Sequence, residues 1–478
     1  MELQDLKKPS KIAFWALAIL LIGAIVFYKE RLLFADSAFI AFNTINYKTL
    51  SIIEHRYGSF ITQIVPYLGQ KLHLPLKVLL IGYTLSFNVF YLVVISLLIF
   101  RFRQYFLAIL MGLYYYLFIS DTYFWTNNEI HQAVGWMFLF YGSFLYMSYK
   151  KTNLAITIPV FIVLAFLTIT THYVVIIPTI FLWLYLLIEQ KHWQFSWKNS
   201  IIFTILLAGV VYLKFAITEP NNYDSNHLHN IIHSSIADFL ASLSAAPAIG
   251  MFLSRCLSNY WVGSLIFIIG LVSLLVDRKF ILAIWCIIAA FGYFIAIATT
   301  YEFDAANLPL FHIESEWACI GIIAATPFVF SFLPKIRPSV AIAMLTVIFI
   351  IRLCYIGSAI PAFSWRIKFE EQVLAQMKKK NIQKMVLVND ETMRSKMILY
   401  WGLPYESVFL SAFHNEWPQR TFIFVDEKNP EIVKQIKDPK NFILDPGLEI
   451  APKDMNYKYF YVDTTQPYQV MTYDALLK

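Results

Sequence analysis

Long apolar runs, separated by short polar segments, fill most of the first 360 residues. A helix needs roughly 20 apolar residues to cross the hydrocarbon core of a bilayer, and about eleven runs come close to that length. These runs are 12–28, 78–100, 104–120, 131–149, 153–170, 172–188, 199–217, 260–276, 280–299, 317–333 and 339–358. The pattern therefore predicts an all-α polytopic membrane protein with about eleven transmembrane helices.

The charges between these runs orient the predicted helices. Cytoplasmic loops of membrane proteins carry an excess of Lys and Arg. With the N-terminus inside, the loops 121–130, 170–173 and 300–316 fall outside and contain neither residue type. An odd number of spans then puts the segment after residue 360 outside. Each segment placed inside carries at least two cations: Lys7, Lys8 and Lys11; Arg101 and Arg103; Lys150 and Lys151; Lys191 and Lys198; Arg278 and Lys279; Lys335 and Arg337.

The composition supports a membrane protein and indicates which kinds of partner the chain has. The chain is 59% hydrophobic and 14% charged, whereas soluble domains average about 25% charged residues. The net charge of +7 comes largely from short clusters between apolar runs, so we expect membrane lipids around the chain and no nucleic-acid partner. All four cysteines lie within or near apolar runs, and no disulfide framework is predicted. No small-residue cleavage site follows run 12–28, which we interpret as a signal anchor.

The pattern changes after residue 360. Residues 366–380 are charged and helical in pattern, and short β-type runs follow. We therefore expect a small extracytoplasmic α/β domain at 361–478, attached to a transmembrane domain at 1–360. The expected strands are 385–388, 421–425 and 457–462.

Two of the predicted outer segments are long, 29–77 and 218–259. Apolar residues recur mostly three and four apart between Ile232 and Leu243, which predicts a helix lying in the membrane interface. The stretch 37–46 is a second candidate for such a helix. The outer side thus has enough ordered polypeptide to build a site.

Asp36 is the first candidate for chemistry. It follows the first apolar run by a few residues and has apolar neighbours, so its carboxylate could accept a proton at the membrane interface. The alternative is a solvated loop acid or a helix N-cap. Within the spans, Lys214 and Arg352 are rare charges, each near an outer helix end. Proton-coupled carriers place ionisable groups at mid-membrane, so this scarcity favours chemistry at the outer surface.

This arrangement resembles the GT-C superfamily of membrane glycosyltransferases. The shared features are an inside N-terminus, a long first outer loop with an acid just after helix one, interfacial helices, many spans and an outer C-terminal domain. The resemblance implies a lipid-phosphate-linked sugar donor and a catalytic base at Asp36. Many members carry paired acids in this loop, whereas Ser37 follows Asp36 here, so the resemblance extends to a single base and not to an acid pair for a metal.

A phosphate that leaves as an anion needs cations or hydrogen-bond donors at the outer face. Each candidate has a plainer alternative: Arg56 pairs with Glu54, His172 bonds a backbone carbonyl, and the remaining two cations only snorkel to the interface. The guanidinium of Arg352 could grip phosphate with two bonds. The four candidate phosphate-binding residues are Arg56, His172, Lys214 and Arg352.

The outer segment 121–131 interleaves aromatic residues with amides and acids. Rings can stack on sugar faces and polar side chains can bond hydroxyls, although an ordinary interfacial belt has the same composition. No cofactor is predicted firmly; a divalent metal at His312, Glu314 and Glu316 is a candidate without a diagnostic spacing. The candidate sugar- or acceptor-binding residues are Asp121, Tyr123, Trp125, Asn128, Glu129 and His131.

The leading hypothesis is a glycosyltransferase of the bacterial inner membrane. It would move a sugar from a polyprenyl-phosphate donor to an acceptor on the periplasmic side. A lipid-linked glycan flippase should show internal repeats and a cationic mid-membrane cavity, and neither is visible in the sequence. An O-antigen-type polymerase should carry arginines in large outer loops, yet 218–259 has only Arg255. A non-catalytic membrane scaffold stays open, as do the sugar, the acceptor, protein partners and oligomeric state.

Overall fold

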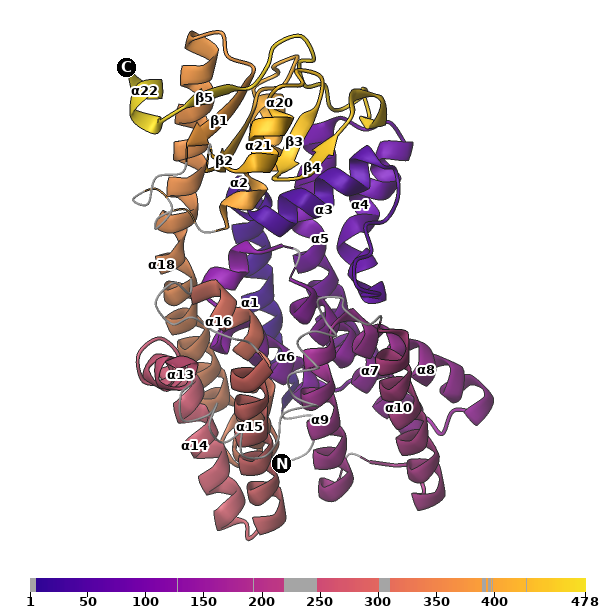
Figure 1. The fold of residues 1–478 in the computed structure, drawn as a ribbon. Helices are drawn as coiled ribbons and strands as arrows, with labels where there is room; N and C mark the ends of the chain where they lie inside the picture. Colours follow the sequence, from indigo (N-terminus) through magenta and orange to yellow (C-terminus); the bar gives the residue numbers. More distant parts are fainter. Residues whose placement is uncertain are drawn as a thin grey trace.

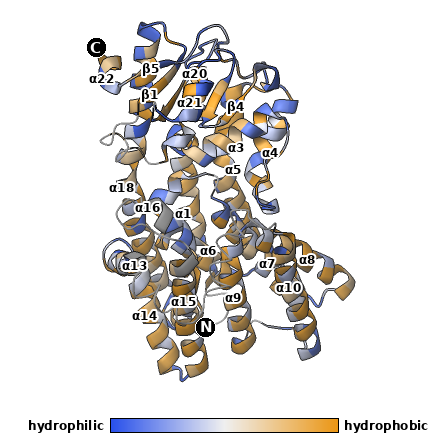
Figure 2. Ribbon diagram, viewed as in Figure 1, coloured by the Kyte–Doolittle hydropathy of each residue, from blue (hydrophilic) through white to orange (hydrophobic). Residues whose placement is uncertain are grey.

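The computed structural model describes residues 6–478 except 127, 192, 219–246, 301–309, 389–392, 394–396, 398 and 427. Long helices form one end of the molecule, and a small α/β domain lies at the other end (Figure 1). Figure 2 shows hydrophobic residues along the long helices and more hydrophilic residues in the C-terminal domain. The predicted interfacial helix between Ile232 and Leu243 lies outside the described residues.

Seven described helices are long and apolar enough to cross a membrane, or up to eight if a bent pair at 250–276 forms one span. The chain is thus built like a multi-pass membrane protein, but the predicted count of about eleven spans is not confirmed. Run 104–120 forms a shorter helix, Tyr105–Leu117, and the helix Glu129–Tyr149 is not among the seven. The seven are Lys7–Val26, Leu76–Arg101, Leu154–Thr171, Trp197–Ile217, Phe280–Ala298, Glu314–Lys335 and Pro338–Lys379.

The centre of the bundle is α6 (Tyr105–Leu117). All of its residues are buried, as expected for a helix that is apolar on every side. It packs against α1 (Lys7–Val26), α17 (Ile320–Pro327) and α18 (Pro338–Lys379). The other helices of this part are α5 (Leu76–Ser96), α7 (Glu129–Tyr149), α8 (Leu154–Thr171), α9 (Ile176–Glu189), α10 (Trp197–Ile217), α13 (Pro247–Leu257), α14 (Trp261–Val276), α15 (Phe280–Thr300) and α16 (Leu310–Trp317).

The segment 29–77 is mostly helical. It contains most of α2 (Tyr28–Leu32), then α3 (Ala35–Asn46), η2 (Tyr57–Ser59) and α4 (Phe60–Lys71). The helix predicted at 37–46 is confirmed, but its apolar side chains pack on the C-terminal domain. Phe42 stacks on Phe460 with 4.6 Å between the ring centroids.

The C-terminal domain has a three-stranded parallel sheet in the order β2-β1-β5. The strands expected at 385–388 and 421–425 are confirmed, and the strand expected at 457–462 is wrong: there only Val462 forms an isolated bridge, to Gln419. Parallel strands need a crossover connection, which α20 supplies between β1 and β2. The elements are β1 (Lys384–Val388), α20 (Leu403–Phe413), β2 (Thr421–Val425), α21 (Pro430–Gln435), β3 (Phe442–Asp445), β4 (Leu448–Ile450), β5 (Gln469–Met471) and α22 (Tyr473–Leu477).

The two ends of the molecule are joined by packing as well as by the chain. Helix α18 is 42 residues long and runs through the predicted boundary at 360 into the C-terminal domain. One buried cluster combines residues of α3, α5 and α18 with the core of that domain. Burial of shared apolar surface therefore holds the domain against the segment 29–77, and the candidate site lies where these parts meet.

Candidate functional site

A cavity of about 360 Å³ lies between the helical bundle and the C-terminal domain. Its walls come from α3, the turn before η2, the start of α7, the junction of α8 with the short helix η5 (Tyr173–Val175), α16 and the turn before α20. Side chains from six separate parts of the chain therefore meet at one cavity. The lining residues with polar or indole side chains are Asp36, Glu54, Arg56, Trp125, Asn128, Glu129, His172, Ser315, Glu316 and Trp401.

Asp36 stands in the first turn of α3 and is partly exposed to this cavity. The residue at the helix N-cap is Phe34, and no side chain of the cap bonds the helix start, so the N-cap alternative for Asp36 is wrong. The pKa of the Asp36 carboxyl is raised to about 7, chiefly because burial removes surrounding water and also because the negative charge of Glu129 is near; the positive charge of Arg56 acts in the opposite direction. A carboxyl with this pKa can accept and return a proton near neutral pH.

Arg56 and Glu129 face each other at the cavity wall. Nη1 of Arg56 lies 3.5 Å from Oε2 of Glu129, and the two side chains are 12% and 15% exposed. Arg56 follows two residues with positive φ, Glu54 at 53° and His55 at 54°, so a tight turn delivers it to the cavity. Lys214 is buried behind this turn and donates to the backbone oxygen of Glu54 at 3.5 Å.

His172 lies at the nearly loopless junction of α8 and η5, and its side chain is buried at the cavity. Its Nδ1 accepts a hydrogen bond from the Val174 N–H at 3.3 Å. Nδ1 therefore does not donate to a backbone carbonyl, as the plainer alternative had it; it accepts from a backbone N–H. An acceptor at Nδ1 corresponds to the neutral tautomer with its proton on Nε2, which makes the ring a hydrogen-bond donor.

Two indoles line the cavity, Trp125 from the turn before α7 and Trp401 from the C-terminal domain. Trp401 packs edge-on against Phe39 with 5.8 Å between the ring centroids. Asn128 caps α7 by accepting from the His131 N–H at 3.1 Å. The predicted recognition segment therefore contributes Trp125, Asn128 and Glu129 to the cavity.

Two other residues of that segment point into the bundle. The Tyr123 hydroxyl donates to the Leu20 carbonyl at 2.7 Å, and the Arg31 guanidinium lies 4.5 Å from the Tyr123 ring centre. His131 is fully buried, with its Nδ1 2.6 Å from the Tyr114 hydroxyl. These contacts fix the core and leave neither side chain at the cavity.

Arg352 and Glu314 form hydrogen bonds with the backbone just before and at the start of the 121–131 segment. Arg352 is buried and donates to the Tyr116 carbonyl at 2.8 Å and the Ile119 carbonyl at 2.9 Å. The Glu314 carboxylate accepts from the backbone N–H groups of Ser120 and Thr122 at 2.8 and 2.9 Å. These polar bonds satisfy backbone groups that would otherwise be buried unpaired. Snorkelling therefore does not describe Arg352.

Asp121 lies near Glu314 and is partly buried. The pKa of its carboxyl is raised to about 7, chiefly by burial and also by the charge of Glu314, while the charge of Arg255 acts in the opposite direction. Asp121 does not line the cavity described above. Asp121 and Asp36 both have a raised pKa, but only Asp36 lies at the cavity.

The metal candidates are split. Glu316 lines the cavity, Glu314 is engaged with the 120–122 backbone, and the His312 side chain lies outside the described residues. Among the described residues, no group of three or more His, Cys, Asp or Glu side chains is arranged to hold a metal ion. The metal at these three residues stays a prediction.

Sequence reasoning missed Trp401 as a site residue. A Trp in the C-terminal domain carries no local signal of its contact with a helix near the N-terminus. Glu54 was noticed only as a partner for Arg56. Searches against models of protein families, against curated proteins and against solved structures find no match for this chain.

Proposed function

We propose that this chain is a membrane glycosyltransferase that takes a sugar from a polyprenyl-phosphate donor and transfers it to an acceptor at the outer face of the bacterial inner membrane. The observation that carries the proposal is the cavity in which Asp36, Arg56, His172 and two indoles meet. A base, anion-binding donors and flat aromatic surfaces are the groups that this reaction needs.

In the proposed reaction, the Asp36 carboxylate accepts the proton of an acceptor hydroxyl. The acceptor oxygen then forms a bond to the anomeric carbon of the sugar, and the bond from that carbon to the phosphate oxygen breaks. The electron pair leaves with the lipid phosphate. Arg56 and Nε2–H of His172 donate to the phosphate oxygens, where charge develops.

The cavity also suits the other parts of the donor. Trp125 and Trp401 offer apolar ring faces to a sugar, while Asn128 and Glu129 offer polar groups to its hydroxyls. The neighbouring helices are long and apolar enough to sit in a bilayer, so a prenyl chain could extend into lipid while its phosphate reaches the cavity. Lys214 supports the Arg56 turn in this scheme.

The test is transfer of labelled sugar from a panel of polyprenyl-phosphate donors by the full chain in lipid nanodiscs. Wild type is compared with Asp36→Asn, which keeps the side-chain size and removes the base. Asp121→Asn is the matched control, because Asp121 also has a raised pKa but lies away from the cavity.

Loss of about 100-fold or more in rate is expected for Asp36→Asn, with less than about twofold for Asp121→Asn. Equal losses in the two variants would remove Asp36 as the base. No transfer by folded wild type across the donor panel would overturn the proposed function.

A further inference from the structure

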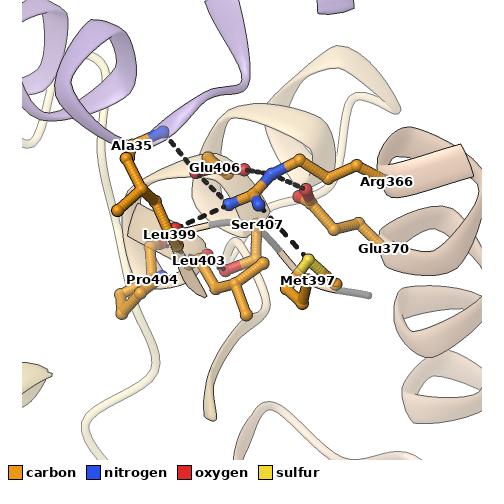
Figure 3. Close-up of polar contacts among 9 residues, drawn as sticks. All are labelled: Ala35, Arg366, Glu370, Met397, Leu399, Leu403, Pro404, Glu406 and Ser407. Atoms are coloured by element: carbon orange, nitrogen blue, oxygen red, sulfur yellow. Dashed lines mark hydrogen bonds and ion pairs between the residues drawn. The ribbon is translucent and has the colours of Figure 1, made fainter. Parts of the chain in front are cut away.

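A buried charged network lies next to Ala35, where α18, α20 and α3 meet (Figure 3). Arg366 on α18 donates to both carboxylate oxygens of Glu406 on α20, from Nε to Oε2 at 2.7 Å and from Nη2 to Oε1 at 2.8 Å. The two side chains are 4% and 0% exposed. A bidentate pair holds its carboxylate in one orientation.

The oriented carboxylate reaches the segment that carries Asp36. Oε1 of Glu406 accepts a hydrogen bond from the Ala35 backbone N–H at 2.8 Å. The first N–H groups of a helix have no partner within it, and the α3 cap offers none from a side chain. Glu406 therefore caps α3 from a distant part of the chain, and a negative charge suits this end of a helix.

The capped peptide is also held in an unfavourable conformation. Ala35 has a φ of 27°, a value that residues with a side chain seldom adopt. Such a conformation persists only where the surroundings hold it. Because Ala35 directly precedes Asp36, holding this peptide fixes the start of α3, whose first turn carries Asp36.

The same guanidinium fixes the opposite wall. Nη2 of Arg366 also donates to the Leu399 carbonyl at 3.2 Å, and Leu399 and Trp401 line the cavity. A Cβ added to Gly402 would lie 2.4 Å from the Ala35 Cα, so this turn touches the start of α3. One network thus holds the base and the indole of the C-terminal domain in a common geometry.

Stability alone is a weak reason for such a network. Burying an ion pair costs desolvation, and an apolar pair of similar volume is often as stable. Glu370 adds a second carboxylate, whose Oε1 lies 3.5 Å from Nε of Arg366, and neither of its oxygens accepts a hydrogen bond from the described residues. The charged pair provides a hydrogen bond to the Ala35 N–H, which an apolar pair could not provide.

We infer that Glu406, held by Arg366, is a positioning residue that aims the Asp36 carboxylate and so makes the C-terminal domain part of the active site. This inference rests on the proposed function. It also gives the C-terminal domain a role in the reaction itself, because that domain supplies the acceptor for the backbone N–H of Ala35, the residue directly before the base.

The test uses the full chain with the double substitution Arg366→Met/Glu406→Leu, which replaces the ion pair by apolar side chains. Glu406→Gln is the conservative variant, since its amide oxygen can still accept from the Ala35 N–H. Glu370→Gln is the matched control, because it removes a carboxylate from Arg366 without touching Ala35. Hydrogen exchange of the 33–38 segment is measured beside kcat and KM.

In the double variant we expect faster exchange at 33–38 and a kcat lower by about 10- to 100-fold, because a small misplacement of a catalytic group has this effect. The donor KM should stay within about twofold. Glu406→Gln should recover most of kcat, and Glu370→Gln should match wild type in exchange and kcat.

Faster exchange with an unchanged kcat, or equal losses in the double variant and Glu370→Gln, would overturn the inference while the proposed function stands. If the double variant unfolds, Glu406→Gln and Glu370→Gln decide: a lower kcat in Glu370→Gln than in Glu406→Gln would overturn it. No transfer by folded wild type would overturn both proposals.

Discussion

Arg56 and Glu129 lie far apart in the sequence, yet the structure sets Nη1 of Arg56 3.5 Å from Oε2 of Glu129 at the wall of the cavity. The pair keeps the guanidinium at the same cavity as Asp36, and in the proposed reaction it limits the net charge of the site before the donor phosphate binds. An entering phosphate would compete with Glu129 for the same donors, since both are anions that a guanidinium binds with two bonds.

Replacing Arg56 should therefore weaken binding of the donor more than of the acceptor. Arg56→Lys keeps the charge but loses the planar fork, and we expect the donor KM to rise by about tenfold. Lys71→Ala, a change of an exposed cation on α4, is the control and should leave KM unchanged. An unaltered donor KM in Arg56→Lys would remove Arg56 from the phosphate site.

The pH dependence follows from Asp36. Its carboxyl must be ionised to accept a proton, and its pKa is about 7, so kcat/KM should rise with pH and level off above pH 7. The charge of Glu129 raises this pKa. Glu129→Gln should therefore move the rising limb to lower pH, measured as kcat/KM from pH 5 to 9.

The sign of this shift is the decisive part. Removing a negative neighbour makes ionisation of Asp36 easier, which lowers its pKa. A limb that moves to higher pH, or that is unchanged, would show that another group controls the profile. Asp121→Asn is again the control, because Asp121 is not among the charges that shift the Asp36 pKa.

Trp401 tests the contribution of the C-terminal domain to substrate binding. Trp401→Ala removes an indole face from the cavity and should raise the KM for the donor sugar by up to about tenfold, which corresponds to the loss of one stacking contact of about 1.4 kcal/mol. Trp417→Ala is the matched control, since Trp417 is in the same domain but is 55% exposed and outside this cavity. Equal effects of the two changes would contradict a specific role for Trp401.

A substitution of Arg352 tests whether this residue stabilises the fold or binds the donor phosphate. Arg352→Met leaves the carbonyls of Tyr116 and Ile119 without this donor and leaves Glu314 without a nearby cation, so we expect the free energy of unfolding to fall by about 3 kcal/mol. Denaturant unfolding in detergent measures this change. Arg337→Met, an exposed arginine just before the same helix, should change it by less than about 0.5 kcal/mol. Normal stability with lost donor binding would instead place Arg352 at the phosphate.

The sequence by itself determined the elements whose signal is local. Runs such as 12–28 and 339–358 have the length and apolarity of a span, and the structure has helices there that could cross a membrane. The sequence also predicted the helix at 37–46 and the strands at 385–388 and 421–425, because the spacing of apolar residues within a short segment indicates its secondary structure. Asp36 is predicted from its position just after the first apolar run, and Arg56 and His172 are predicted as cations or hydrogen-bond donors on the outer side.

Only the tertiary structure decided which candidates share a cavity. Asp36, Arg56, Glu129 and His172 meet there, whereas Arg352 and His131 turn into the bundle. Whether a polar side chain faces a cavity or a buried backbone carbonyl depends on how helices distant in the sequence pack. The local spacing of residues does not predict that packing. The cap on α3 shows the same limit, because its acceptor, Glu406, comes from the C-terminal domain and becomes a neighbour of Ala35 only when the chain has folded.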